Sequence, residues 1–107
     1  MIVILAALTL APAVARGDVL VSRPAPSIDC GETIKTGLWY RDFPTQGGRR
    51  ATIAIQSSSG ATLWRRTVTA TDRWRYFRYP PRCGRHYRVR YETVAATTTF
   101  RVAVRRR

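Results

Sequence analysis

The chain has 107 residues with 19 basic and six acidic side chains, which gives a formal net charge of +13. This length suffices for one domain with a small hydrophobic core and excludes a second domain of ordinary size. The excess of positive charge favours polyanionic partners, such as nucleic acid, acidic cell-wall polymers, lipopolysaccharide or anionic lipid.

Residues 1–15 have the features of a signal peptide. Ile2 to Leu10 is an apolar run too short to span a bilayer, and small residues ending at Ala15 form a signal peptidase site. No basic residue precedes the apolar run, which departs from the usual pattern, and the alternative is a buried first strand. We expect a secreted protein with no membrane anchor in the mature chain and a single domain over residues 16–107.

Two alternating segments begin the β-rich part of the chain. Residues 18–23 alternate apolar and polar side chains and are followed by two prolines, which predicts a short strand. In residues 33–41, Ile34, Leu38 and Tyr40 share one parity, which predicts a second strand with these side chains directed inward.

The next two segments predict a hairpin. Residues 50–56 alternate with small and branched apolar side chains inward, the serines and glycine of 57–60 are typical of a turn, and 61–69 returns as the partner strand. Leu63 and Trp64 fall on opposite parities of that partner strand. We therefore expect a β-bulge there.

Three further strands complete the chain, at residues 73–79, 87–93 and 98–104. Arginine and aromatic side chains alternate in the first two, which predicts strands with one apolar and one charged face. A Pro-Pro pair, a cysteine and a glycine separate these two strands and indicate a corner between them.

Cys30 and Cys83 are the only cysteines. In a secreted protein they are expected to form a disulfide, which would stabilise so small a domain by roughly 4 kcal/mol. Metal ligation and a catalytic thiol are the alternatives. Two cysteines and the single histidine, His86, cannot complete a zinc site without a carboxylate, and neither cysteine lies in a C-x-x-C motif. We expect no metal and no cofactor.

Seven short strands with turn signals between them predict an all-β fold, a small antiparallel β-sandwich with one disulfide. The segment Gly84 to Tyr91 (G-R-H-Y-R-V-R-Y) resembles the G-x-x-Y-x-V corner of immunoglobulin-like and fibronectin type III-like sandwiches. The resemblance covers about eight residues and implies architecture, not function. It implies that the Tyr87 hydroxyl bonds to the backbone a few residues upstream, and we expect the hydroxyl to donate to a buried backbone acceptor.

The chain departs from both families at Cys83. The fibronectin pattern has a proline before the glycine where this chain has Cys83, and antibody domains place their cysteine two residues after the tyrosine. We therefore expect the bridge at the edge or end of the sandwich, not at its centre.

The sequence contains no convincing catalytic constellation. His86 and Glu92 lie six residues apart on one predicted strand, roughly 20 Å if extended, which is too far for acid–base cooperation. Glu32 is an alternative partner that the sequence does not place. The serines at 57–59 have no histidine nearby in the sequence to complete a triad. We expect no enzymatic activity and no catalytic residues.

The arginines suggest a binding surface. Arg88 and Arg90 lie on one side of strand 87–93, and Arg101 has the same relation to its apolar neighbours on strand 98–104. If these strands pair, the three side chains share one sheet face. The residues expected to bind a polyanion are Arg88, Arg90, Arg101, Arg105, Arg106 and Arg107.

Three tryptophans add planar side chains. Trp39, Trp64 and Trp74 have the shape to stack on bases or sugars. In a sandwich this small, however, packing in the core is the expectation for each of them.

Two functional hypotheses remain. The first is a non-catalytic module that binds an extracellular polyanion, either a cell-wall polymer, a polysaccharide, a nucleic acid or another cell-surface component. The alternative is a structural or protein-interaction immunoglobulin-like domain whose basicity is compositional, because one lysine, no asparagine and 18 arginines fit a GC-rich genome. A cationic antimicrobial protein or toxin is a third. Arginines clustered on one face favour the first, and an even scatter or an exposed apolar patch favours the second.

Overall fold

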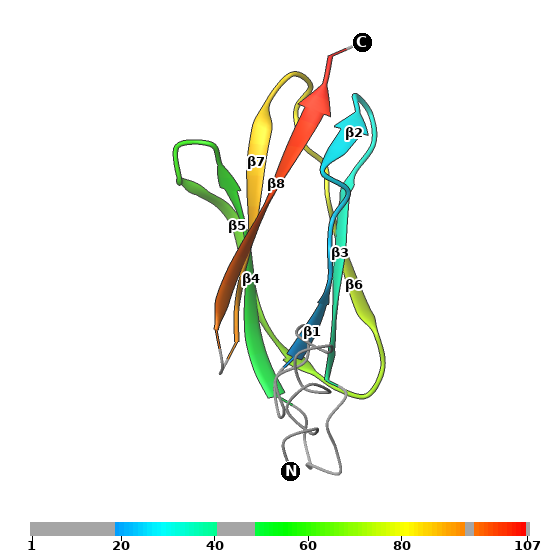
Figure 1. Ribbon diagram of the computed structural model, residues 1–107, viewed down its shortest axis with the longest axis vertical. Helices are drawn as coiled ribbons and strands as arrows, with labels where there is room; N and C mark the ends of the chain where they lie inside the picture. The colour runs from blue at the N-terminus through cyan, green and yellow to red at the C-terminus, as the bar shows by residue number, and fades with distance from the viewer. Residues whose placement is uncertain (1–18, 41–48, 94–95, 107) are drawn as a thin grey trace, which may run out of the picture.

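The computed structural model describes residues 19–40, 49–93 and 96–106. Over these ranges the protein is all-β, with eight strands in two sheets that face each other as a sandwich (Figure 1). No helix long and apolar enough to cross a membrane occurs in this part of the chain. The predicted signal peptide, residues 1–15, and Arg107 lie outside the described residues.

Each sheet combines strands from distant parts of the sequence. The three-stranded sheet has the order β1 (Val19–Ser22), β3 (Ile34–Tyr40) and β6 (Arg75–Tyr79). The five-stranded sheet has the order β2 (Ser27–Asp29), β8 (Thr97–Arg105), β7 (His86–Glu92), β4 (Arg49–Ser57) and β5 (Thr62–Ala70). The chain crosses between the two sheets immediately after β1.

The predicted sandwich with one disulfide is confirmed, with one strand more than the seven expected. The additional strand, β2, pairs in parallel with β8, although we expected only antiparallel pairing. Three residues that follow a proline are too few for a period of two to be recognised. The Pro26 carbonyl nevertheless accepts a hydrogen bond from the N–H of Ala103 at 2.9 Å, which continues the pairing.

The alternating side chains form the core between the sheets. Leu38, Ile53 and Val89 come from three strands and are completely buried, and the inward parities predicted for their strands are confirmed. The predicted bulge is also present. Ile55 pairs with Trp64 and the next residue of β4 pairs with Thr62, so Leu63 is the extra residue and is 48% exposed.

One polar contact joins the two sheets through the core. Thr36 on β3 is the buried polar residue of the described chain, and its hydroxyl donates to the Ser22 carbonyl at 2.7 Å. The hydroxyl of Tyr91, on β7 of the other sheet, forms a short hydrogen bond with the Thr36 oxygen. Because the single Thr36 proton is directed to Ser22, Tyr91 must be the donor.

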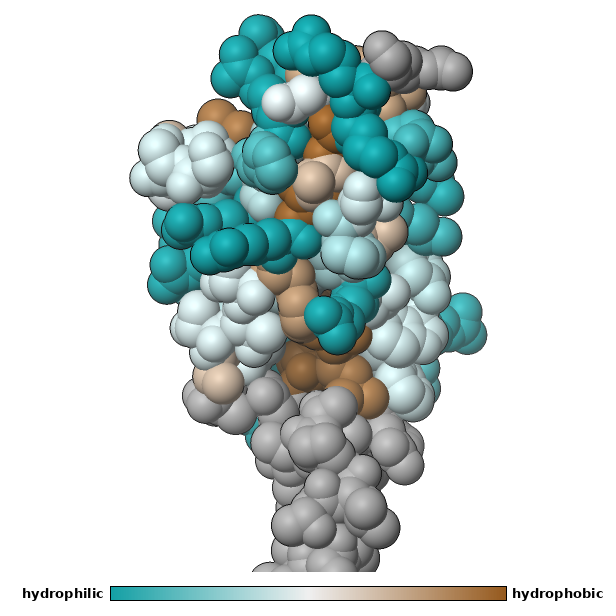
Figure 2. All heavy atoms as spheres, turned by 45° about the horizontal axis from the view of Figure 1, so that its top comes forward, coloured by the Kyte–Doolittle hydropathy of each residue, from teal (hydrophilic) through white to brown (hydrophobic). Residues whose placement is uncertain are grey.

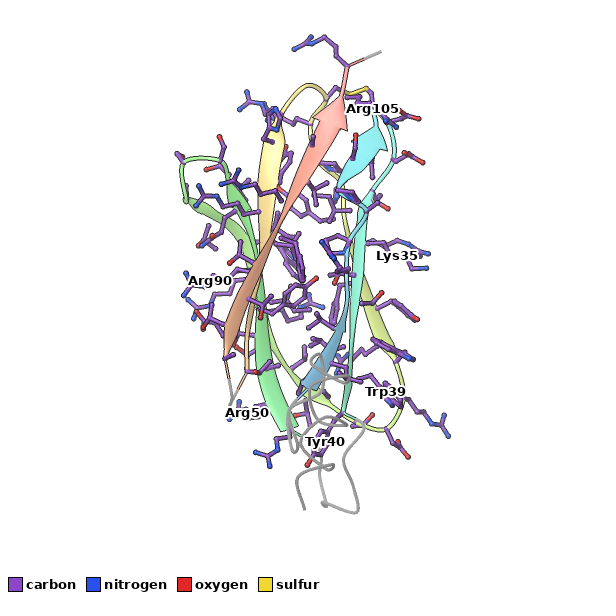
Figure 3. All side chains as sticks on the ribbon, in the orientation of Figure 1. Lys35, Trp39, Tyr40, Arg50, Arg90 and Arg105 are labelled. Atoms are coloured by element: carbon purple, nitrogen blue, oxygen red, sulfur yellow. A yellow bond between two sulfur atoms is a disulfide. The ribbon has the colours of Figure 1, made fainter. Side chains whose placement is uncertain are left out.

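The disulfide lies at one end of the sandwich, as expected. Cys30 follows β2, Cys83 lies in the loop between β6 and β7, and their Cα atoms are 4.9 Å apart. Figure 3 shows the bond at the end where β8 finishes. The bridge fastens the edge strand β2 to the loop that crosses from one sheet to the other, and it indicates an oxidising environment.

A corner precedes β7. The Arg82 N–H, five residues upstream, donates to the Tyr87 hydroxyl oxygen at 2.7 Å, so the hydroxyl bonds to the backbone as acceptor and not as the donor that we expected. Gly84 has a φ of 75°, a left-handed conformation that favours glycine, and its N–H donates to the Val104 carbonyl at 2.9 Å. The corner is thereby attached to the end of β8.

Replacing Tyr87 by Phe should lower the free energy of unfolding by about 1 kcal/mol, because the Arg82 N–H loses its acceptor while the ring stays in place. Arg82 itself is exposed, so water can replace part of the lost bond. Urea unfolding of the variant and the wild type would measure the difference. Identical midpoints and slopes would show that the ring packs without the hydroxyl contributing.

Candidate anion-binding site

The pairing of β7 with β8 places two of the predicted arginines face to face. Arg88 lies directly opposite Arg101, whereas Arg90 lies opposite Thr99. Burial alternates along both strands, so these arginines project from the outer face of the five-stranded sheet. Figure 3 shows Arg90 and Arg50 pointing away from the other sheet.

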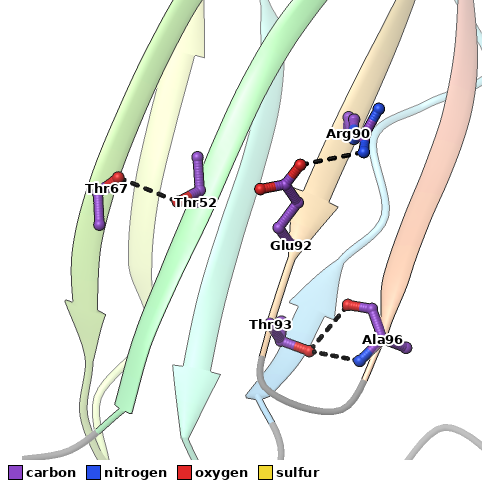
Figure 4. A network of polar contacts seen from close by, with 6 residues as sticks. All are labelled: Thr52, Thr67, Arg90, Glu92, Thr93 and Ala96. Atoms are coloured by element: carbon purple, nitrogen blue, oxygen red, sulfur yellow. Dashed lines mark hydrogen bonds and ion pairs between the residues drawn. The ribbon is translucent and has the colours of Figure 1, made fainter.

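Two of the other predicted arginines are already paired with acids. Arg90 contacts Glu92 at 3.0 Å (Figure 4), and Arg105 contacts Asp29 on β2 at 2.7 Å. Both pairs are exposed and contribute little to stability, but each lowers the local positive charge. Arg106 packs its guanidinium against Gly84. Of the five predicted arginines that the structure describes, Arg90, Arg105 and Arg106 are therefore engaged by other residues, whereas Arg107 lies outside the described residues.

Arg88 and Arg101 differ from these residues. Like charges directly opposite each other on neighbouring strands repel, and no acidic residue in the described ranges pairs with either of them. Together with Ser58, His86 and Tyr87 they line a depression of about 230 Å³. An oxyanion bound there would relieve the repulsion and accept hydrogen bonds from both guanidinium groups.

A larger cleft adjoins this depression. It has a volume of about 570 Å³, shares Ser58, His86 and Tyr87 with the smaller one, and adds Arg82 and Arg85 from the loop before β7. Figure 2 shows hydrophilic side chains gathered over this end of the molecule, with a strip of hydrophobic ones along its middle. The two depressions together form a basic track around the start of β7.

The sequence did not predict that Ser58 lies near His86. The turn after β4 is brought to the start of β7 because β4 pairs with β7, with Ser57 opposite Tyr87. Only that long-range pairing would have revealed that the two residues line the same depression. No hydrogen bond joins Ser58 to His86, although the structure describes both residues.

The carboxylates that were considered as catalytic partners are engaged elsewhere. Glu92 lies at the far end of β7 from His86 and binds Arg90, and the Glu32 carboxylate accepts the N–H of Asp29 at 2.7 Å. The arrangement at the start of β7 thus supplies positive charge and hydrogen-bond donors for an anion.

The tryptophans correct an expectation. Trp64 packs against the core and lies 6.1 Å from the ring of Phe77. Trp39 and Trp74, for which core packing was also expected, instead lie on the outer side of the three-stranded sheet, next to each other.

No protein-family model matches this chain, and no curated protein matches it either.

Proposed function

We propose that this protein is a secreted, non-catalytic β-sandwich module that binds an extracellular polyanion through Arg88 and Arg101. The observation that carries the proposal is the direct opposition of these two arginines on a solvent-facing sheet surface without a described acidic partner. Such an arrangement is unfavourable in the free protein and becomes favourable when an anionic group bridges the pair.

The ligand is a polymer and not a single ion. Arg82 and Arg85 line the cleft that adjoins the depression of Arg88 and Arg101, and the two share three residues. Successive sulfate, phosphate or carboxylate groups of one chain would therefore meet successive guanidinium groups. The net charge of +13 adds long-range attraction for such a chain.

An immunoglobulin-like protein-interaction domain is the second candidate. The strand orders β1-β3-β6 and β2-β8-β7-β4-β5 and the hydrogen bond from Arg82 to Tyr87 support the resemblance. β5 and β6 are edge strands to which a partner strand could add. Both of these edges carry exposed arginines, and charge on an edge strand opposes such pairing, whereas the edge strand β1 carries no charged residue. The polyanion proposal is the stronger because it rests on a specific pair, Arg88 opposite Arg101, without a described acidic partner.

Replacing both arginines of the site by Gln should reduce the affinity for heparin about tenfold at near-physiological ionic strength, because two ionic contacts disappear. The slope of log affinity against log salt concentration should fall by about 1 to 2 for the same reason. A titration series over salt concentration, with wild type and Arg88→Gln/Arg101→Gln, measures both quantities.

The matched control is Arg50→Gln/Arg73→Gln, which removes the same charge. Arg50 lies at the other end of the sheet face (Figure 3), and the sequence places Arg73 in the loop before β6. Arg23 and Arg49 are unsuitable controls, because they contact the rings of Phe100 and Tyr40. Equal losses of affinity and slope in both double variants would refute a site and leave only general charge attraction.

A further inference from the structure

Three aromatic side chains lie together on the outer face of the three-stranded sheet, opposite to the face that carries Arg88 and Arg101. The ring centroids of Trp39 and Trp74 are 5.3 Å apart, and those of Trp74 and Tyr76 are 5.9 Å apart with nearly parallel planes. Trp74 is 39% exposed and Tyr76 is 50% exposed. We call these three residues the aromatic face.

The sequence of β3 explains why these rings point outward. Trp39 stands between two buried residues, so its side chain has the opposite parity and projects to solvent, as Figure 3 shows. Gly37 lies opposite Tyr76, and a Cβ atom added to this glycine would lie only 2.8 Å from the tyrosine ring. The glycine therefore allows the ring to lie directly against the sheet.

Two cations border the aromatic face. The Lys35 ammonium group lies 4.8 Å from the centroid of the Tyr76 ring, and Arg78 lies directly opposite Lys35 on β6. Neither forms an ion pair with an acid in the described ranges. Positive charge thus stands beside exposed planar rings, and no carboxylate among the described residues pairs with it.

We infer that the aromatic face is a second binding surface, for the sugar rings of an acidic polysaccharide. The apolar C–H face of a pyranose ring fits the exposed face of Trp74, and a uronic acid carboxylate beside it would meet Lys35 and Arg78. This surface is independent of the Arg88–Arg101 site and lies on the other side of the sandwich.

Two other occupants fit less well. A second copy of the chain would bring two net charges of +13 together, which opposes association through this face. A nucleic acid base can also stack on these rings, but a sugar separates its phosphate from the base, whereas a uronic acid carries its carboxylate on the stacking ring itself, beside the cation that lies 4.8 Å from the Tyr76 ring. The charge and the shape therefore favour a flat, anionic sugar chain.

The test uses a polyuronate octasaccharide and three substitutions of Trp74. Trp74→Leu keeps an apolar side chain but removes the planar ring, and we expect it to weaken binding about tenfold. Trp74→Phe keeps a flat ring and should retain most of the affinity. Trp74→Ala should bind the octasaccharide as weakly as Trp74→Leu, because both variants lack the planar ring. Thermal unfolding of each variant confirms that the fold is intact, as expected for a side chain outside the core.

The salt dependence separates this surface from the first site. Stacking releases no counterions, so Trp74→Leu should lower the affinity without changing its salt slope, in contrast to Arg88→Gln/Arg101→Gln. Equal binding of the octasaccharide by Trp74→Leu and wild type would overturn the inference. A loss confined to an oligothymidylate of equal length would overturn it too, and would assign the face to nucleic acid. The proposal for one surface can therefore be refuted while the proposal for the other stands.

Discussion

Removal of the disulfide should lower the free energy of unfolding by about 4 kcal/mol in the variant Cys30→Ser/Cys83→Ser. The bridge joins residues 53 positions apart, so its loss releases a long loop in the unfolded chain. For a domain of this size, the expected fall in melting temperature is roughly 15–30 °C. No other single change proposed for this protein has so large an expected effect.

Thermal unfolding of the wild type with and without a reducing agent measures the same quantity in a second way. The double serine variant is the control, because its melting temperature should not respond to the reductant. Equal melting temperatures for the oxidised and the reduced wild type would mean that packing alone maintains the sandwich and that the bridge only fastens the edge strand β2.

Alkaline pH should destabilise the protein through Tyr91. Burial raises the pKa of this phenol from 10.0 to about 12, against a smaller, opposing effect of the hydrogen bond with Thr36. Because the folded-state pKa lies above the unfolded one, the stabilisation is complete below pH 10. It is lost as the pH rises toward 12, by about 2 to 3 kcal/mol.

Urea unfolding at several pH values between 8 and 12 would measure this loss. Tyr91→Phe has no proton to lose, so its stability should start lower at pH 8, where the Thr36 oxygen lacks a donor, and then change less with pH. Tyr87→Phe is the matched control and should keep the full pH dependence. Parallel curves for Tyr91→Phe and wild type would contradict the assignment.

Local pattern was sufficient to predict most of the fold. The period-two alternation around Ile53 and Val89 identified the inward faces, because a sheet with one buried side leaves little freedom of register. It could not identify β2, whose pairing with β8 comes from tertiary contact and not from its own three residues. Parity alone also placed Trp39 outside, but the hydrophobicity of tryptophan led to the opposite expectation.

The candidate site was predictable only in part, because long-range strand pairing decides which arginines lie next to an acidic residue and which do not. The parity of Arg88 and Arg101 was correct, and their meeting required only that β7 and β8 form a hairpin. The neutralisation of Arg105 by Asp29 depends on the parallel strand that the sequence did not reveal. Ser58 reaches the site through the pairing of β4 with β7, which no local signal specifies.

The parallel pairing of β2 with β8 has a mechanical consequence. β1 begins near one end of the sandwich and β8 finishes at the other, so tension along the chain would pull β2 and β8 in opposite directions along their length (Figure 1). Their hydrogen bonds would then resist shear together instead of opening one after another. After these hydrogen bonds break, the disulfide between Cys30 and Cys83 keeps strands β3 to β6 out of the extended chain. The extension of the domain would thus be limited to the residues that lie outside the loop closed by the disulfide.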